Sequence, residues 1–155
     1  MTDQKSLQDT YAPHNSCFGC GPSNAQGLQI KSKVSGDEVI ADWTPSPHHE
    51  AFPGVLNGGI IGALLDCHSN WTAAYHLMKT AGVDHPPCTV TASFSVKLLK
   101  PTPSALPVHL IAKPQNIKGD RATIFAELFS GADLCATCEG VFVAVKPGHP
   151  AYHRW

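Results

Sequence analysis

A single carboxylate stands in the middle of a long apolar segment of this chain. Asp66 is the only acidic residue between Gly58 and Met78, and no Lys or Arg lies three or four residues from it to form the usual surface ion pair. An acid in such a segment is either part of a solvated helix face or a group that exchanges a proton during a reaction. The missing partner favours the second interpretation.

The segment begins with Asn57-Gly58-Gly59, which has the composition of a helix start. The first N–H groups of a helix have no partner within it, and they carry the positive end of the helix dipole. Such groups can hold a carbonyl oxygen that gains negative charge, and glycine lets a ligand reach the backbone. An ordinary capped helix start beside a tight turn explains the same residues without a site.

The hydrophobic pattern predicts the helix that must position these two features, over about 57 to 80. Asn57 is a favourable N-cap residue, and Gly82 is favourable just past the C-terminus. Side chains suited to a buried stripe recur at Ile60, Leu64, Cys67, His68, Trp71, Ala74, Tyr75 and Met78. Small and polar residues, open to a partner element or a ligand, line the opposite face at Gly59, Gly62, Asp66, Ser69, Asn70 and Ala73.

On this helix Asp66 follows Asn57 by nine residues, which is about 13 Å along the axis. One helix therefore cannot bring its own Asp66 to a carbonyl held at its own N-terminus, whereas an antiparallel helix of a second chain can. If the site is catalytic, we expect it to be shared between two subunits.

The rest of the chain has the two-residue period of β-strands. Alternating runs lie at about 27–34, 39–43, 90–98, 106–117, 122–129 and 134–146. Short turns between the later runs force antiparallel pairing, and one long helix must bury its stripe on the one sheet available. We therefore predict an α+β hot-dog architecture, in which an antiparallel sheet of about five strands wraps around one long central helix.

Length and composition limit the classes of function. The 155 residues predict one domain, placed at 27–146 between an irregular lead-in at 1–26 and a tail at 147–155. Charged residues make up 15%, against about 25% in ordinary domains, so we expect much of the surface to contact another subunit. A net charge of -1 argues against nucleic acid as a partner.

The apolar runs are far shorter than the roughly 20 residues that span a bilayer, so we expect no membrane partner. The polar N-terminus MTDQKSLQDTY predicts a cytoplasmic protein, and the six cysteines are then expected as thiols. The chain has two Cys-x-x-Cys pairs, Cys17 with Cys20 and Cys135 with Cys138. Together their four thiolates would complete a tetrahedral zinc site.

The second of these pairs is poorly placed for chelation. Cys135 and Cys138 fall at a predicted strand, where an offset of three points side chains to opposite faces. We therefore expect no metal and no cofactor. We interpret Cys67 as a buried, unreactive thiol on the packed side of the helix.

Three segments of the chain resemble a known family, the PaaI-like branch of the hot-dog thioesterases, over about residues 17 to 146. They are CFGCGPSNAQGLQI at 17–30, FPGVLNGGIIGALLD at 52–66 and VTASFSVKLLKPTP at 90–103. The second is similar to the family's His-Gly-Gly helix start, which an acid follows nine residues after the histidine. Asn57 stands here in place of that histidine.

The resemblance implies a role for each of three residues, and Asn57, which departs from the family, keeps the capping role that its residue type predicts. Asp66 would be the general base or the nucleophile, and the N–H of Gly58 would donate to the oxyanion. Asn57 would cap the helix, and Thr91, ten residues before Pro101, would help to place the attacking water. The implied reaction is hydrolysis of an acyl-coenzyme A thioester, without a metal, by a dimer or a dimer of dimers.

The replacement of the histidine keeps a second function open. Asn57 can donate a hydrogen bond but cannot carry a proton, which fits a non-catalytic acyl-CoA-binding or sensor protein. A hot-dog hydratase or dehydratase would need a paired histidine and acid near the helix, and Asn57 argues against it. The candidate cations for the coenzyme A phosphates are Lys97, Lys100, Lys113, Lys118 and Arg121.

Overall fold

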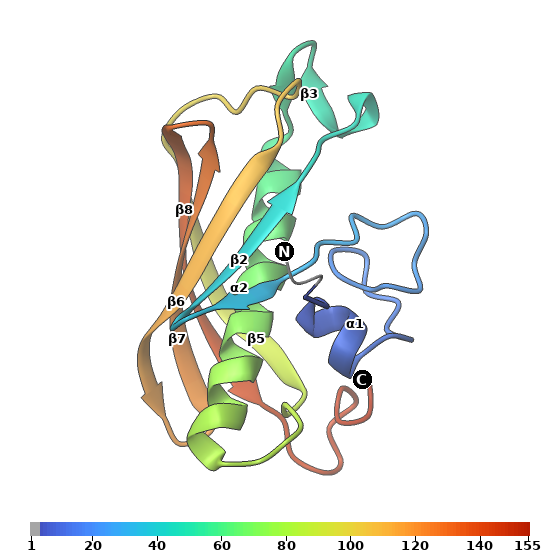
Figure 1. The fold of residues 1–155 in the computed structure, drawn as a ribbon, viewed down its shortest axis with the longest axis vertical. Helices are drawn as coiled ribbons and strands as arrows, with labels where there is room; N and C mark the ends of the chain where they lie inside the picture. Colours follow the sequence, from blue (N-terminus) through green and yellow to red (C-terminus); the bar gives the residue numbers. More distant parts are fainter. Residues whose placement is uncertain (1–3) are drawn as a thin grey trace.

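The computed structural model describes residues 4–155 and contains one long helix and a six-stranded antiparallel sheet (Figure 1). The sheet has the strand order β1-β2-β6-β7-β8-β5. Its strands are β1 (Lys33–Ser35), β2 (Glu38–Trp43), β5 (Thr89–Leu98), β6 (Val108–Lys118), β7 (Arg121–Ser130) and β8 (Asp133–Ala144). The hot-dog prediction is confirmed, with six strands where about five were expected, because each of the six alternating runs contributes a strand.

Helix α2 (Gly58–Ala81) lies lengthwise across the sheet and agrees closely with the predicted helix (Figure 1). The side chain of Asn57 caps its start by accepting hydrogen bonds from the N–H groups of Gly59 and Ile60. Gly82 ends the helix in the left-handed conformation at φ 69°, which glycine adopts without strain. The sequence signals at both ends therefore acted as expected.

The core lies between α2 and the sheet. It is formed by fully buried apolar side chains, among them Leu64, Leu65, Leu110, Ile124, Leu128 and Phe142. His68 is also fully buried, with one ring nitrogen 2.8 Å from Ser32 Oγ and the other 2.8 Å from the carbonyl oxygen of Val39. Burial lowers the pKa of His68 to about 4, so this ring is neutral at pH 7 and ties the helix to β2.

The lead-in and the tail cover the side of α2 that faces away from the sheet (Figure 1). The short helix α1 (Leu7–Tyr11) belongs to this cover, and Trp155 from the tail stacks on Trp71 with ring centroids 4.3 Å apart. Residues 68 to 74 are all buried, Trp71 against Cys20 and Trp155, and Asn70 against Thr89 of β5. The small polar face was expected to allow close approach of a partner element or a ligand, and at Asn70 the element that approaches is β5 of the same chain. Ser69 and Ala73 are buried as well.

Two predicted segments have a different local structure. In the run 27–34 only the end pairs as β1, because the N–H groups of Leu28 and Ile30 donate to Phe18 and Gly19 of the lead-in instead of a strand. The loop expected before the helix contains a 3-10 turn, η1 (Pro47–His49), and a small hairpin of β3 (Glu50–Phe52) and β4 (Val55–Leu56).

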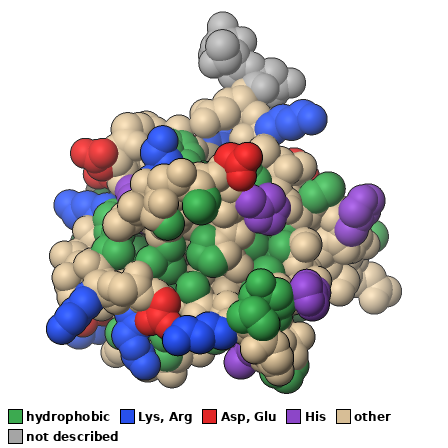
Figure 2. Space-filling model, turned by 90° about the horizontal axis from the view of Figure 1, so that it is seen from below, with side chains coloured by type: hydrophobic (Ala, Val, Ile, Leu, Met, Phe, Trp, Pro, Cys, Tyr) green, Lys and Arg blue, Asp and Glu red, His purple; other side chains and the backbone are tan. Residues whose placement is uncertain are grey.

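Several expectations concern the surface and the ends of the chain. Within residues 4–155, no helix combines the length and the hydropathy needed to cross a membrane. The part of the predicted lead-in at residues 1–3 lies outside the described residues. Seen from below, hydrophobic side chains gather in the middle of the face, with basic and acidic side chains interspersed around them (Figure 2). This face lacks the continuous basic surface that a phosphate backbone requires.

We expect Leu64→Ala to lower the free energy of unfolding by about 2–5 kcal/mol, because truncating a fully buried leucine leaves a cavity between helix and sheet. Leu106→Ala is the matched control, since the side chain of Leu106 is 49% exposed, and its effect is expected within about 0.5 kcal/mol. Urea unfolding followed by tryptophan fluorescence measures both. Equal effects of the two variants would contradict the packing described here.

Candidate active site

Asp66 lies where α2 faces β5, the last strand of the sheet. The carboxylate is half-buried, and the hydroxyl of Thr91 on β5 donates a hydrogen bond of 2.7 Å to Asp66 Oδ1. The structure thus brings together two residues that the sequence nominated separately. Thr91 contacts the carboxylate itself, a contact that its expected role in placing water did not include.

A second pair repeats this contact one helical turn further along. The hydroxyl of Thr89 donates to Asn70 Oδ1 over 2.6 Å, and the amide of Asn70 lies 3.3 Å from the carbonyl oxygen of Thr89. Because residues two apart on a strand share a face, Thr89 and Thr91 both reach α2. Asn70 was missed as a site residue, although its position four residues after Asp66 places it on the same helix face.

Arg154 of the tail is a further residue that sequence reasoning missed. Its guanidinium donates to the carbonyl oxygen of Thr89 over 2.8 Å, which holds its positive charge near Asp66. The segment around it, PGHPAYHRW, has no periodic pattern and gave no signal of this position.

The pKa of Asp66 is raised above its ordinary value. Burial is the main cause, because it disfavours the charged carboxylate, and the neighbouring Cys17 adds to it when ionised. The hydrogen bond from Thr91 and the charge of Arg154 act in the opposite direction. A carboxylate with a raised pKa is a better base than one on the surface, which is how acids at catalytic sites are tuned.

Asp66 lines a cavity of about 230 Å³. The cavity is bordered by Asp66, Cys67 and Asn70 of α2, Val90 and Thr91 of β5, Cys17 and Cys20 of the lead-in, and Arg154 of the tail. Three thiols therefore share the cavity wall with the carboxylate. Cys67, which was predicted to be a buried thiol, is only partly buried, and it packs against the lead-in.

The three thiols interact with one another. The sulfurs of Cys17 and Cys67 are 3.8 Å apart. The pKa of Cys17 is lowered because the thiols of Cys20 and Cys67 donate hydrogen bonds to its thiolate. The hydrogen bond with Cys17 and burial raise the pKa of Cys20 to about 12. The hydrogen bonds with Cys17 and Cys20 raise the pKa of Cys67.

Gly58 and Asn57 lie together at the start of α2, as predicted. The Asn57 side chain accepts from the N–H groups of Gly59 at 2.8 Å and Ile60 at 3.1 Å. In the described part of the chain, no hydrogen bond uses the N–H of Gly58. The capping geometry thus leaves that N–H available to a ligand.

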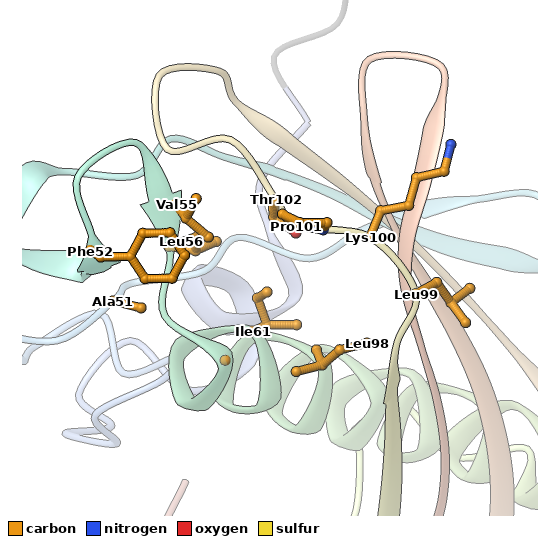
Figure 3. A pocket seen from close by; sticks show the side chains of 11 residues that line it. Ala51, Phe52, Val55, Leu56, Ile61, Leu98, Leu99, Lys100, Pro101 and Thr102 are labelled. Carbon is orange, nitrogen blue, oxygen red and sulfur yellow. The ribbon is translucent and has the colours of Figure 1, made fainter.

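Gly58 borders a second and larger cavity of about 370 Å³ (Figure 3). Its wall is mainly apolar and comes from the β3–β4 hairpin, the start of α2, the end of β5 and the segment after it. Its residues include Phe52, Val55, Leu56, Ile61, Leu98 and Pro101. Lys100 also borders it, but its amino group extends away from these side chains and pairs with Asp133 at 3.1 Å.

The expected oxyanion donor and the expected base border different cavities of one chain. Gly58 borders the larger cavity and Asp66 the smaller one, and eight residues of helix, about 12 Å, separate them. The candidate cations for phosphate are exposed along β5, β6 and β7 and in the loop after β5. Of these five, Lys100 alone borders the larger cavity.

Comparisons with known proteins agree with this architecture. No protein-family model and no curated protein matches the sequence. A thioesterase superfamily protein from Shewanella loihica is 27% identical, with a TM-score of 0.66 over 81% of this chain and 98% of that one. The E. coli PaaI protein, from the phenylacetic acid degradation operon, is 12% identical, with a TM-score of 0.67 over 80% of this chain and 85% of that one.

A phenylacetic acid degradation-related protein from Ralstonia eutropha is also similar, at 18% identity and a TM-score of 0.66 over 81% of this chain and 92% of that one. The chain has the hot-dog fold of the thioesterase superfamily. The predicted resemblance to hot-dog thioesterases of the PaaI kind is thereby confirmed.

We expect Thr91→Val to lower the free energy of unfolding by about 1.5–3 kcal/mol at neutral pH, because the half-buried carboxylate loses its hydroxyl donor. Thr91→Ser keeps the hydroxyl and serves as the matched control. In the Asp66→Asn background the effect of Thr91→Val should shrink, since the acceptor is no longer charged. A double-mutant cycle from urea unfolding measures the coupling, and a coupling free energy of zero would contradict this contact.

Proposed function

We propose that this protein hydrolyses an acyl-coenzyme A thioester to a free acid and coenzyme A. The observation that carries the proposal is the half-buried Asp66 carboxylate, which Thr91 holds at the wall of a cavity. It is supported by the hot-dog fold, since similar solved structures include thioesterases. A reducing compartment such as the cytoplasm fits the six free cysteines.

Asp66 and water perform the proposed reaction. The hydroxyl of Thr91 donates its hydrogen bond to Asp66 Oδ1, which leaves the other carboxylate oxygen free. That oxygen takes a proton from a water molecule while the oxygen of the water attacks the thioester carbon. The C–S bond then breaks, and coenzyme A leaves as a thiolate that takes up a proton. In the other route the carboxylate attacks the carbon directly, and water hydrolyses the resulting anhydride.

The N–H of Gly58 is the proposed donor to the carbonyl oxygen as that oxygen becomes negative. It has the positive end of the α2 dipole behind it, and Asn57 leaves it free. A thioester held there would place its carbon chain against the apolar wall of the larger cavity, near Leu56, Ile61 and Leu98.

A second copy of the chain must then supply Asp66, because a straight helix holds its own Asp66 about 12 Å from its own Gly58. β5 is an edge strand of the sheet, and its exposed side chains include Phe94 and Leu98. An exposed apolar edge strand is a ready template for pairing with another chain. We therefore propose a homodimer at minimum, or a dimer of dimers, with the active site shared between chains.

A non-catalytic acyl-CoA-binding protein is the second candidate. The observation that favours it is Asn57. Its carboxamide oxygen accepts from two N–H groups, and the group has no proton that it could transfer to a substrate at the helix start. Both candidates hold the carbonyl at Gly58, so binding alone does not distinguish them. Release of coenzyme A from a panel of acyl-CoAs, followed with a thiol reagent, does: tight binding without turnover identifies the binding protein.

We expect Asp66→Asn to reduce hydrolysis by roughly 10²–10⁴-fold, the usual consequence of losing a general base. Folding and acyl-CoA binding should persist, because the substitution keeps the shape of the side chain and leaves Gly58 unchanged. The matched control is Asp84→Asn, at an exposed position in the loop after α2, which should retain the parent rate. Wild-type turnover by Asp66→Asn would remove the catalytic assignment.

A mixed dimer tests the shared site. Asp66→Asn and Gly58→Phe inactivate different halves of it, so each homodimer should be inactive, while a heterodimer contains one intact site. An added Cβ at Gly58 lies 3.2 Å from Cδ1 of the exposed Leu98, which can move, so the variant should fold. We expect up to half of the wild-type activity per heterodimer after subunit exchange. No recovered activity, or a monomer by light scattering, would refute the two-chain site.

A further inference from the structure

Three cysteines that are far apart in the sequence meet beside the candidate active site. Cys17 and Cys20 come from the lead-in and Cys67 from α2, and their sulfurs all lie within 4.8 Å of one another. We call these three residues the thiol cluster. Thioester hydrolysis at Asp66 as proposed above makes no use of the thiol cluster, so its arrangement needs a separate explanation.

The lead-in is shaped to bring its two thiols to the helix. Residues 17–21 form a tight turn, closed by a 2.8 Å hydrogen bond from the Gly21 N–H to the Cys17 carbonyl oxygen. A Cβ at Gly19 would lie 2.3 Å from Cys67 Sγ, and one at Gly21 would lie 2.4 Å from the nitrogen of Cys17. Only glycine therefore allows the turn to approach this closely to α2.

The spacing of the sulfurs fits a tetrahedral metal ion. With Zn–S bonds of about 2.3 Å, two thiolates on one tetrahedral zinc lie about 3.8 Å apart. The sulfurs of Cys17 and Cys67 are 3.8 Å apart. A disulfide requires about 2.05 Å, so these two thiols are not cross-linked, and their spacing is compatible with two ligands of one ion.

A donor beside the cluster is placed as donors are around metal-bound thiolates. Trp71 Nε1 donates to Cys20 Sγ at 3.4 Å. Such outer contacts orient thiolate ligands and stabilise their charge. Trp71 is itself fixed by full burial and by the stacked Trp155.

We propose that Cys17, Cys20 and Cys67 bind one zinc ion as three thiolates, with the fourth position open to the cavity that Asp66 lines. Three soft sulfur ligands select zinc over magnesium or calcium. The ion replaces the remaining thiol protons, which pass to solvent, and no electron is transferred. Zinc with three thiolates has a net charge of -1, and the guanidinium of Arg154 lies on the same cavity wall.

This site differs from the one considered in the sequence, where Cys135 and Cys138 were the partners of the first pair. Neither belongs to the cluster: Cys135 lies near the carbonyl oxygen of Pro101, and Cys138 pairs with Val96 within the sheet. The expectation of no zinc rested on the poor convergence of those two cysteine pairs. Cys67 supplies the third ligand in place of the second pair, and the proposed ion links the lead-in to α2.

The test is the metal content of the full chain, produced with zinc in the medium and purified under reducing conditions without chelator. We expect one zinc per chain by elemental analysis, lost in Cys67→Ser and in Cys20→Ser. Cys88→Ser is the matched control, because Cys88 is also a half-buried thiol but lies outside the cluster, and it should retain the metal. The proposal would be overturned if elemental analysis of the wild-type protein found no zinc, or found copper bound instead of zinc.

Cobalt gives a second readout that does not depend on whether the variants fold. Wild-type protein reconstituted with Co²⁺ should show thiolate-to-cobalt charge-transfer absorption and the intense visible bands of tetrahedral geometry. Both should be absent after the thiols are alkylated. A six-coordinate cobalt spectrum, or cobalt bound equally well by alkylated protein, would refute the thiol cluster as the site. Neither readout requires thioesterase activity, so failure of the proposed function leaves this test intact.

Discussion

The burial of helix α2 on nearly all sides is the constraint on which the rest of the structure depends. One sheet covers only one face of a helix, and residues 4–155 form one large sheet besides a two-stranded hairpin. The lead-in and the tail therefore cover the other face, where Trp155 stacks on Trp71 and the lead-in reaches Cys67. The lead-in and the tail border the cavity beside Asp66, whereas neither borders the cavity at Gly58, and both cavities leave room for a ligand.

The same burial determines the chemistry of Asp66. A carboxylate removed from water needs hydrogen bonds and opposite charge to stay ionised, and its neighbours supply both. Thr91 donates from β5 and Arg154 brings a positive charge from the tail, yet burial prevails and the pKa stays raised. A basic but still chargeable carboxylate is what the proposed proton transfer requires. The segments that stabilise the helix thus also tune the acid on it.

Local patterns in the sequence were enough to predict the helix and the strands, and they singled out Asp66 as a candidate. Periodicity and capping act over a few residues, and the missing ion-pair partner of Asp66 is visible within one helical turn. Contacts between distant segments left no such pattern. The sulfurs of Cys17 and Cys67 meet across 50 residues, and Arg154 reaches Thr89 across 65, so neither pairing follows from spacing. For Asn70 the sequence predicted the helix face on which it lies, but not its hydrogen bond with Thr89.

The start of α2 and Asp66 divide the proposed reaction between them. Residues 57 to 65 contain no titratable side chain, and Asn57 uses its carboxamide to satisfy two N–H groups while leaving that of Gly58 free. The helix start can therefore hold an oxyanion but cannot move a proton. Asp66 can move a proton, but a rigid helix keeps it about 12 Å from its own Gly58. Because neither half can approach the other within one chain, a hydrolase built from these residues requires two copies of the helix.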